Sequence, residues 1–151
     1  MTADIAPNIA PDIILLTERI RRVWTLREHH VWEAANLLRP ELKHETDNLD
    51  GRRFAKLVKS DALVEAVLIL TSLVAPQRSI TRISSNEMHW ICSMRCDQTR
   101  PARSFKVCHA DFAAALLISF LKSYADKLQR HELAPVREVR EHSNKEKADE
   151  P

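Results

Sequence analysis

Glycine is almost absent from this chain: Gly51 is the only one among 151 residues, whereas average usage would give about ten. Phosphate-cradling loops and dinucleotide-binding turns need several glycines close together, because only a residue without a side chain lets the backbone approach an oxyanion so closely. Tight two-residue hairpins also favour glycine, since they require positive φ. The sequence therefore excludes the common nucleotide-binding loops and favours helices over an all-β fold.

The length and charge balance indicate one globular domain, which we expect over residues 11–135. Its 23 basic and 21 acidic side chains give a net charge of +2, too small to attract nucleic acid or a membrane from a distance. There is no basic flank ahead of an apolar run at the N-terminus, and the longest apolar run, over 62–75, is too short to cross a bilayer. Three cysteines without a secretion signal indicate reduced thiols. We therefore expect a cytoplasmic protein with no membrane partner.

Hydrophobic spacing predicts helices in the first half of the chain. Apolar residues recur every three or four positions over 12–39 with one interruption, so this region forms one long helix or two short ones. We expect a turn that ends at Gly51, with the glycine left-handed, and then a short helix over 52–59. A helix over 61–75, capped by Ser60 and Asp61, is apolar around nearly its whole circumference. That pattern predicts that it is the central, most buried element.

Beyond residue 76 the apolar residues alternate, which predicts β-strands. The alternating runs lie at 79–83, 89–96 and 103–108. One face of the second run carries Trp90, Cys92, Met94 and Cys96. A helix over 111–131 supplies the cover that the apolar face of such a sheet needs. The expected fold is a helix-rich α+β fold: N-terminal helices plus a small three-stranded antiparallel sheet covered by a long C-terminal helix. Residues 1–10 and 136–151 are too polar to offset the entropy of ordering, so we expect both to be disordered.

All three cysteines and two histidines gather near the second and third predicted strands. These potential metal ligands are His89, Cys92, Cys96, Cys108 and His109. Thiolate and imidazole are the ligands that tetrahedral zinc prefers, so a zinc-stabilised domain is one hypothesis. The spacing of the first cysteine pair does not match a zinc knuckle, and cysteines that alternate with apolar residues are typical of a buried strand face. We therefore expect core cysteines and no cofactor.

No pattern of catalytic residues stands out. Glu41 and His44 form a single Glu-x-x-His, whereas carboxylate-bridged di-iron bundles use two copies and further glutamates. Cys108 and His109 are adjacent on a predicted strand, so their side chains alternate to opposite faces and do not form a catalytic dyad. We expect a protein that is not an enzyme.

Basic residues concentrate over 77–109, where six of them outnumber two acidic residues. Five basic residues at or beside this predicted hairpin are candidate contacts for nucleic acid or another partner: Arg82, Arg95, Arg100, Arg103 and Lys106. Arginine on a β-ribbon can enter a major groove or contact phosphates. Charged side chains also occupy ordinary solvent-facing positions of a sheet. We expect no aromatic stacking platform beside them, because Trp90 and Phe105 are predicted to face the core.

The order helix, strands, helix over residues 61–128 is accompanied by Trp90-x-Cys92 in a middle strand and by an alanine- and leucine-rich final helix. In these features the region resembles the small phage-encoded α-β-α sandwich domains. The resemblance implies a bacterial or prophage accessory protein and brings no activity with it. We expect a small non-enzymatic protein that binds or inhibits another macromolecule, most simply a protein. The alternatives are a nucleic-acid-binding regulator that uses the hairpin over 77–109, and a zinc-stabilised domain.

Overall fold

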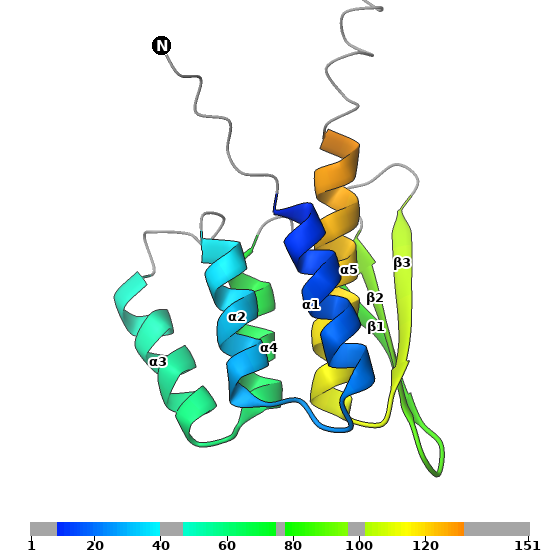
Figure 1. Ribbon diagram of the computed structural model, residues 1–151, viewed down its shortest axis with the longest axis horizontal. Coiled ribbons are helices and arrows are strands. Elements are labelled where there is room, and N and C mark those ends of the chain that lie inside the picture. The colour runs from blue at the N-terminus through cyan, green and yellow to red at the C-terminus, as the bar shows by residue number, and fades with distance from the viewer. Residues whose placement is uncertain (1–8, 40–46, 75–77, 97–101, 132–151) are drawn as a thin grey trace, which may run out of the picture.

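The computed structural model describes residues 9–39, 47–74, 78–96 and 102–131 (Figure 1). Within these ranges the helices are α1 (Ala10–Arg22), α2 (Glu28–Leu38), α3 (Asp47–Lys59), α4 (Leu63–Leu73) and α5 (Phe112–His131). The strands are β1 (Arg78–Ser85), β2 (Trp90–Cys96) and β3 (Arg103–His109). The arrangement confirms the expected α+β fold with a small antiparallel sheet and a long C-terminal helix. The predictions of disorder for residues 1–8 and 136–151 lie outside the described residues, but the prediction was wrong for Ala10, which is the buried first residue of α1.

The strands form one antiparallel sheet in the order β1-β2-β3. β1 is longer than predicted, because its pairing with β2 continues to Ser85, opposite Trp90. The register contains one irregularity: Ile80 pairs with Met94, and Arg82 rather than Thr81 pairs with the next residue of β2. Thr81 is therefore the extra residue of a β-bulge. Figure 1 shows the β1-β2 hairpin projecting beyond the ends of the neighbouring helices.

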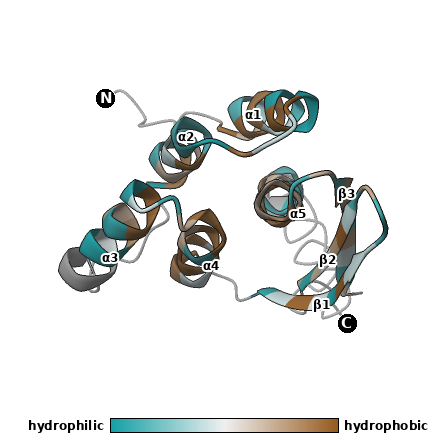
Figure 2. Ribbon diagram, turned by 90° about the horizontal axis from the view of Figure 1, so that it is seen from below, coloured by the Kyte–Doolittle hydropathy of each residue, from teal (hydrophilic) through white to brown (hydrophobic). Residues whose placement is uncertain are grey.

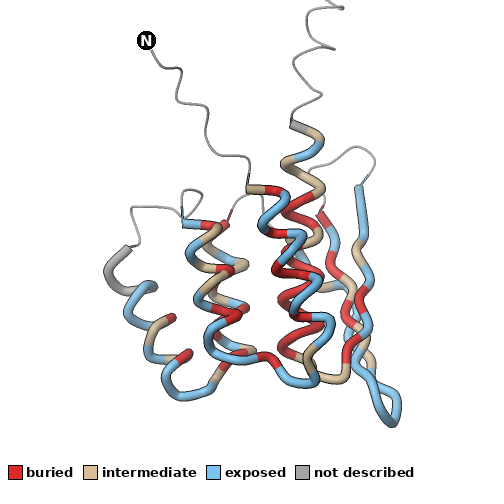
Figure 3. The backbone as a smooth tube through the Cα atoms, in the orientation of Figure 1, coloured by how far each residue is buried: buried red, intermediate tan, exposed pale blue. Residues whose placement is uncertain are grey.

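The centre of the molecule is α5, and the prediction that the 61–75 helix would be the most buried element was wrong. Figure 2 shows α5 with the sheet on one side and α1 and α4 on the other. Every residue from Ala113 to Leu121 is buried (Figure 3), whereas Leu68 of α4 is 41% exposed. Burial depends on which helix lies between the two layers, and three successive alanines at the start of α5 allow close approach from both sides. Hydrophobicity alone did not distinguish the two helices.

The region over 12–39, predicted to form one long helix or two short ones, forms the two helices α1 and α2. After α1 the backbone becomes extended at Val23. The Leu26 N–H then donates to the carboxylate of Asp111, 2.8 Å away at the start of α5. The Arg27 N–H donates to Nδ1 of His30 at 3.0 Å, which satisfies a backbone donor at the start of α2. The polar interruption in the sequence therefore marks the restart of the helix.

Gly51 does not lie in a turn. It is the fifth residue of α3, which begins at Asp47, and no glycine of the described chain has a positive φ. The prediction of a left-handed glycine before a helix over 52–59 was therefore wrong. The polar run was mistaken for a turn because glycine and aspartate are common in turns, although a helix with one solvent-facing side also tolerates them at a cost.

The left-handed residue is Asp61, with a φ of 59°. The Ala62 N–H donates to the carbonyl of Leu57 at 2.9 Å, and the Asp61 N–H donates to the carbonyl of Val58 at 3.0 Å. These two bonds form the Schellman motif that ends a helix. The prediction that Ser60 and Asp61 cap the next helix was wrong, since both belong to the end of α3, and Ala62 is the N-cap of α4.

Candidate nucleic-acid interface

The two faces of the sheet differ in character. Cys92, Met94 and Cys96 of β2 are buried on the side that α5 covers, so alternation turns the side chains between them away from α5. We call this second side the outer face. By the strand register it consists of Ser79, Arg82, Ser84, Ile91, Ser93, Arg95, Ser104, Lys106 and Cys108. Figure 2 shows that the described helices all lie on the other side of the sheet.

Three of the predicted basic residues come together on the outer face. Arg82 of β1 and Lys106 of β3 both pair with Ser93 of the middle strand, so the three residues form a row across the sheet. Arg95 lies on the same face, two residues farther along β2. With neighbouring strands about 4.8 Å apart, the Cα atoms of Arg82 and Lys106 are about 10 Å apart. We call Arg82, Arg95 and Lys106 the basic cluster.

The bulge at Thr81 is what brings Arg82 into the basic cluster. Ile80 pairs with the buried Met94 and therefore faces inward. In a regular strand Arg82, two residues later, would face inward too. The extra residue reverses the alternation, so Arg82 faces outward and is exposed. The sequence carries a signal of this bulge, because Ile80 and Ile83 both face inward although they are three residues apart, which regular alternation does not allow.

The other basic residues of the region are not part of the cluster. The Arg103 guanidinium forms an ion pair with Asp126 of α5 at 2.5 Å, and the same carboxylate meets Arg130 at 3.3 Å. Arg78 is half-buried, and its guanidinium carbon lies 5.2 Å from the centre of the Phe120 ring on the inner side of the sheet. The predicted contact Arg100 lies outside the described residues.

The charges on the strand residues of the outer face are of one sign. Its charged side chains are all cations, because none of its strand residues is aspartate or glutamate. Ser93 lies between Arg82 and Lys106, Ser79 and Ser104 lie on either side of Arg95, and Ser84 follows Arg82 on the same face of β1. Arginine, lysine and serine are the side chains that commonly contact phosphate oxygens. The outer face therefore has the composition of a polyanion-binding surface.

The two aromatic residues expected in the core are only partly covered. Trp90 lies on the inner side and its ring centre is 5.1 Å from that of Phe112, yet 38% of the residue is exposed. Phe105 is half-buried beside α5. Neither belongs to the outer face, so among the described residues that face offers no aromatic ring on which a base could stack.

The five potential zinc ligands do not converge. Cys92 and Cys96 are buried on the inner side of the sheet as expected, whereas the expectation of a core residue was wrong for Cys108, which alternation places exposed on the outer face. His89 is exposed in the hairpin loop. Among the described residues, no three side chains of histidine, cysteine, aspartate or glutamate gather as metal ligands would. Burial raises the pKa of the Cys92 thiol, whose neighbour is the Ser119 hydroxyl at 3.6 Å; this thiol is a core group.

His109 has a structural role. It is buried, Nδ1 accepts the Asp111 N–H at 2.9 Å, and Nε2 lies 3.0 Å from the carbonyl oxygen of Ile20. Since Nδ1 is the acceptor, Nε2 carries the proton and donates to that carbonyl. Both ring nitrogens are thus engaged, on the opposite side of the sheet from Cys108. The expected separation of Cys108 and His109 is confirmed; Glu41 and His44 lie outside the described residues.

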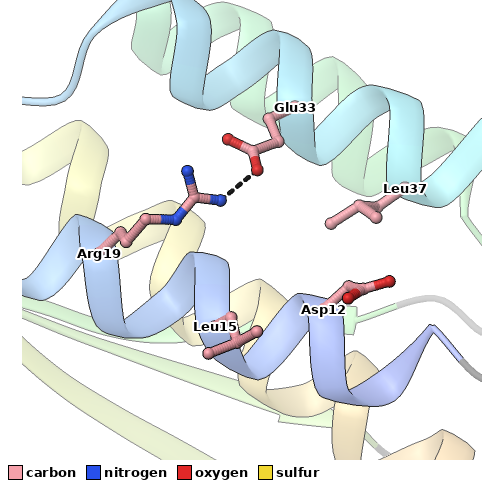
Figure 4. Close-up of a pocket in the computed structure, with 5 residues that line it drawn as sticks. All are labelled: Asp12, Leu15, Arg19, Glu33 and Leu37. Atoms are coloured by element: carbon pink, nitrogen blue, oxygen red, sulfur yellow. Dashed lines mark hydrogen bonds and ion pairs between the residues drawn. The ribbon is translucent and has the colours of Figure 1, made fainter.

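Two grooves flank α1, and sequence reasoning did not find either of them. The first, of about 380 Å³, lies between α1 and α2 and is lined by Asp12, Leu15, Arg19, Glu33 and Leu37 (Figure 4). The second, of about 250 Å³, lies between α1 and β3 over α5 and includes Ile14, Phe105 and Ala125. The signal in the sequence was the pair Ile14 and Leu15, which fall outside the buried stripe of α1.

Comparison with protein families, with curated proteins and with solved structures finds no match to this chain. The resemblance of residues 61–128 to phage-encoded sandwich domains stays a prediction. In the part of the chain that the structure describes, no helix has both the length and the apolar character needed to traverse a bilayer.

Proposed function

We propose that this protein binds nucleic acid through the phosphates, using the basic cluster on the outer face of the sheet, and that it acts by binding without chemistry of its own. The observation that carries the proposal is the row of Arg82, Ser93 and Lys106 across three strands, with Arg95 beside it and no carboxylate among the described strand residues of the same face. Such a surface complements a chain of phosphates in charge and in hydrogen-bond donors.

The proposed contact is with the backbone of the nucleic acid and is indifferent to base sequence. The outer face has no aromatic side chain among the described residues, so base stacking does not contribute. Three neutralised phosphates give a slope of about −2.7 for log K against log salt on duplex DNA, and about −2.1 on a single strand. Because the overall charge is only +2, we expect affinity in the range of non-specific binding, with Kd of about 10⁻⁴ to 10⁻⁶ M at physiological salt.

Fluorescence anisotropy of labelled duplex DNA, single-stranded DNA and RNA of mixed sequence tests the proposal, with salt varied from about 50 to about 200 mM. Arg82→Ala and Lys106→Ala should each weaken binding and flatten the duplex slope by about 0.9, the contribution of one phosphate. The matched control is Arg52→Ala, which removes an exposed arginine from α3 at the far side of the molecule (Figure 1). It should leave both affinity and slope unchanged.

Two results would contradict the proposal. One is the absence of binding at the lowest salt concentration. The other is a loss of affinity that is equal for Arg52→Ala and Arg82→Ala, because net charge and not the outer face would then account for binding.

A protein partner is the second candidate function, favoured by the end of the β1-β2 hairpin. Met88 is 72% exposed there, and Ile83 and Trp90 are 48% and 38% exposed. Clustered exposed apolar side chains mark protein interaction sites in soluble proteins. A photo-crosslinking residue at position 88 should capture one defined protein in an extract of the native cells, and Ile83→Asp should abolish this capture while nucleic-acid binding persists. Failure of Ile83→Asp to change the crosslinked product would argue against this function.

A further inference from the structure

The exposed side of α1 carries two large apolar residues. Leu15 is 62% exposed and Ile14 is 43% exposed, whereas Ile13, Leu16 and Ile20 of the same helix are fully buried. The buried stripe of α1 is therefore complete without Leu15, which contributes little to the core of its own chain.

Charged residues of opposite sign lie on either side of Leu15. Asp12 is one turn before it and Arg19 one turn after it, so that Asp12, Leu15 and Arg19 form a stripe along α1. Asp12 and Arg19 are about 10.5 Å apart along the helix axis, and Leu15 lies near the midpoint between them. We call these three residues the α1 stripe.

The α1 stripe forms one wall of the groove between α1 and α2. Figure 4 shows Leu15 and Leu37 along the groove, Asp12 at one end, and the ion pair of Arg19 with Glu33 at the other. The side chain of Arg19 is still about half exposed in this pair. The groove thus has an apolar middle, an acidic end, and an end where a guanidinium can donate hydrogen bonds to a second carboxylate.

We propose that the α1 stripe binds a second copy of this chain, with the two α1 helices antiparallel across a two-fold axis near Leu15. In this arrangement Asp12 of each copy faces Arg19 of the other, and the two Leu15 side chains meet at the axis. A parallel arrangement would instead place Asp12 against Asp12 and Arg19 against Arg19.

The self-complementary order of charges is the reason for choosing a second copy over an unrelated partner. A two-fold interface uses the same patch on both subunits, so its charges must match when the patch is reversed. Acid, leucine and base at nearly equal spacing satisfy this condition. Leu15 enters the apolar middle of the opposite groove, beside Leu37, as ridges of one helix pack into grooves of another. The interface shares no residue with the basic cluster, so the proposal is independent of the proposed function.

Sedimentation equilibrium of the full chain over a range of concentrations tests the proposal. The wild type should form dimers within a concentration series that extends to several hundred micromolar. Leu15→Ser should raise the dimer dissociation constant by about tenfold or more, because it removes the apolar contact at the axis. Arg52→Asp, a charge reversal on α3 away from the interface, should leave the constant unchanged.

Charge reversal gives the decisive result. Asp12→Arg and Arg19→Asp should each be monomeric with native circular dichroism, because each homodimer would bring like charges together. An equimolar mixture of the two should form heterodimers, since both contacts are then between opposite charges. A wild type that stays monomeric, a Leu15→Ser variant that dimerises as well as the wild type, or a mixture that stays monomeric would each overturn the proposal.

Discussion

Replacing Gly51 by alanine should stabilise the protein. Gly51 is an exposed residue inside α3, its φ is not positive, and a Cβ added there meets no atom within 4 Å. Alanine is the residue most favourable to helix, and glycine in a helix costs about 0.8–1.0 kcal/mol relative to it. Nothing in the surroundings of Gly51 opposes this gain, since the new methyl group contacts no neighbour.

We expect Gly51→Ala to raise the free energy of unfolding by about 1 kcal/mol, which corresponds to a rise in Tm of about 2–4 °C for a chain of this length. If Gly51 were left-handed in a turn, alanine would instead be strained by about 1–2 kcal/mol. The two interpretations therefore differ in sign.

Urea denaturation followed by far-ultraviolet circular dichroism measures the effect, with a higher midpoint at an unchanged m-value as the expected result. Asp61→Gly is the matching variant, because it relieves the left-handed conformation at the end of α3. The charge of Asp61 lies between the C-terminus of α3 and the N-terminus of α4, so its two dipole effects oppose each other. Asp61→Gly should add roughly 0.5–1 kcal/mol. A lower midpoint for Gly51→Ala would refute the helical assignment of Gly51.

Three further predictions concern other residues. Burial, together with nearby positive charges, lowers the pKa of His30, so folding favours its neutral form. The contribution of His30 to stability should therefore be complete above about pH 6.5 and fall as the pH drops below that value. His30→Gln should reduce this fall, as measured by urea midpoints between about pH 7.5 and about pH 5. Cys108 should be the one described thiol that reacts quickly with Ellman's reagent in the native state, while Cys92 reacts only on unfolding; a fast phase that survives Cys108→Ser would contradict this. Asp111→Ala should lower the free energy of unfolding by about 1.5–3 kcal/mol, because the Leu26 N–H loses a charged acceptor. Asp111→Asn should lower it less. Equal urea midpoints for the two variants would contradict the role of Asp111 as the acceptor for Leu26.

Short-range patterns were enough to predict the class of fold but not the packing that creates the candidate interface. Alternating residues gave all three strands, and the inward face of Cys92, Met94 and Cys96 followed from the same alternation. The outward position of Arg82 depends on the bulge at Thr81. Its local signal was the three-residue spacing of Ile80 and Ile83, which the prediction treated as regular alternation. The ion pair of Arg103 depends on where α5 crosses the sheet, because its partner Asp126 is 23 residues farther along the chain.

Errors in the helical region have a related cause. Turn-forming residues at 47–51 suggested a break where the helix continues, and the actual break uses an aspartate in a conformation that glycine adopts more easily. The burial order of α4 and α5 could not be read from hydrophobicity, because it depends on which helix the sheet covers.

Because α1 packs against α5, this protein cannot complete its fold until α5 has been synthesised. The bonds from His109 to Ile20 and from Leu26 to Asp111 join residues 89 and 85 positions apart, and α1 packs along α5. Contacts this distant in sequence carry a large loop-closure entropy and slow folding. During synthesis the sides of α1 and α4 that pack against α5 stay uncovered until α5 leaves the ribosome. The growing chain, rather than the finished protein, is therefore the form most exposed to aggregation, and its yield should respond to translation rate and to chaperones more than to the stability of the folded state.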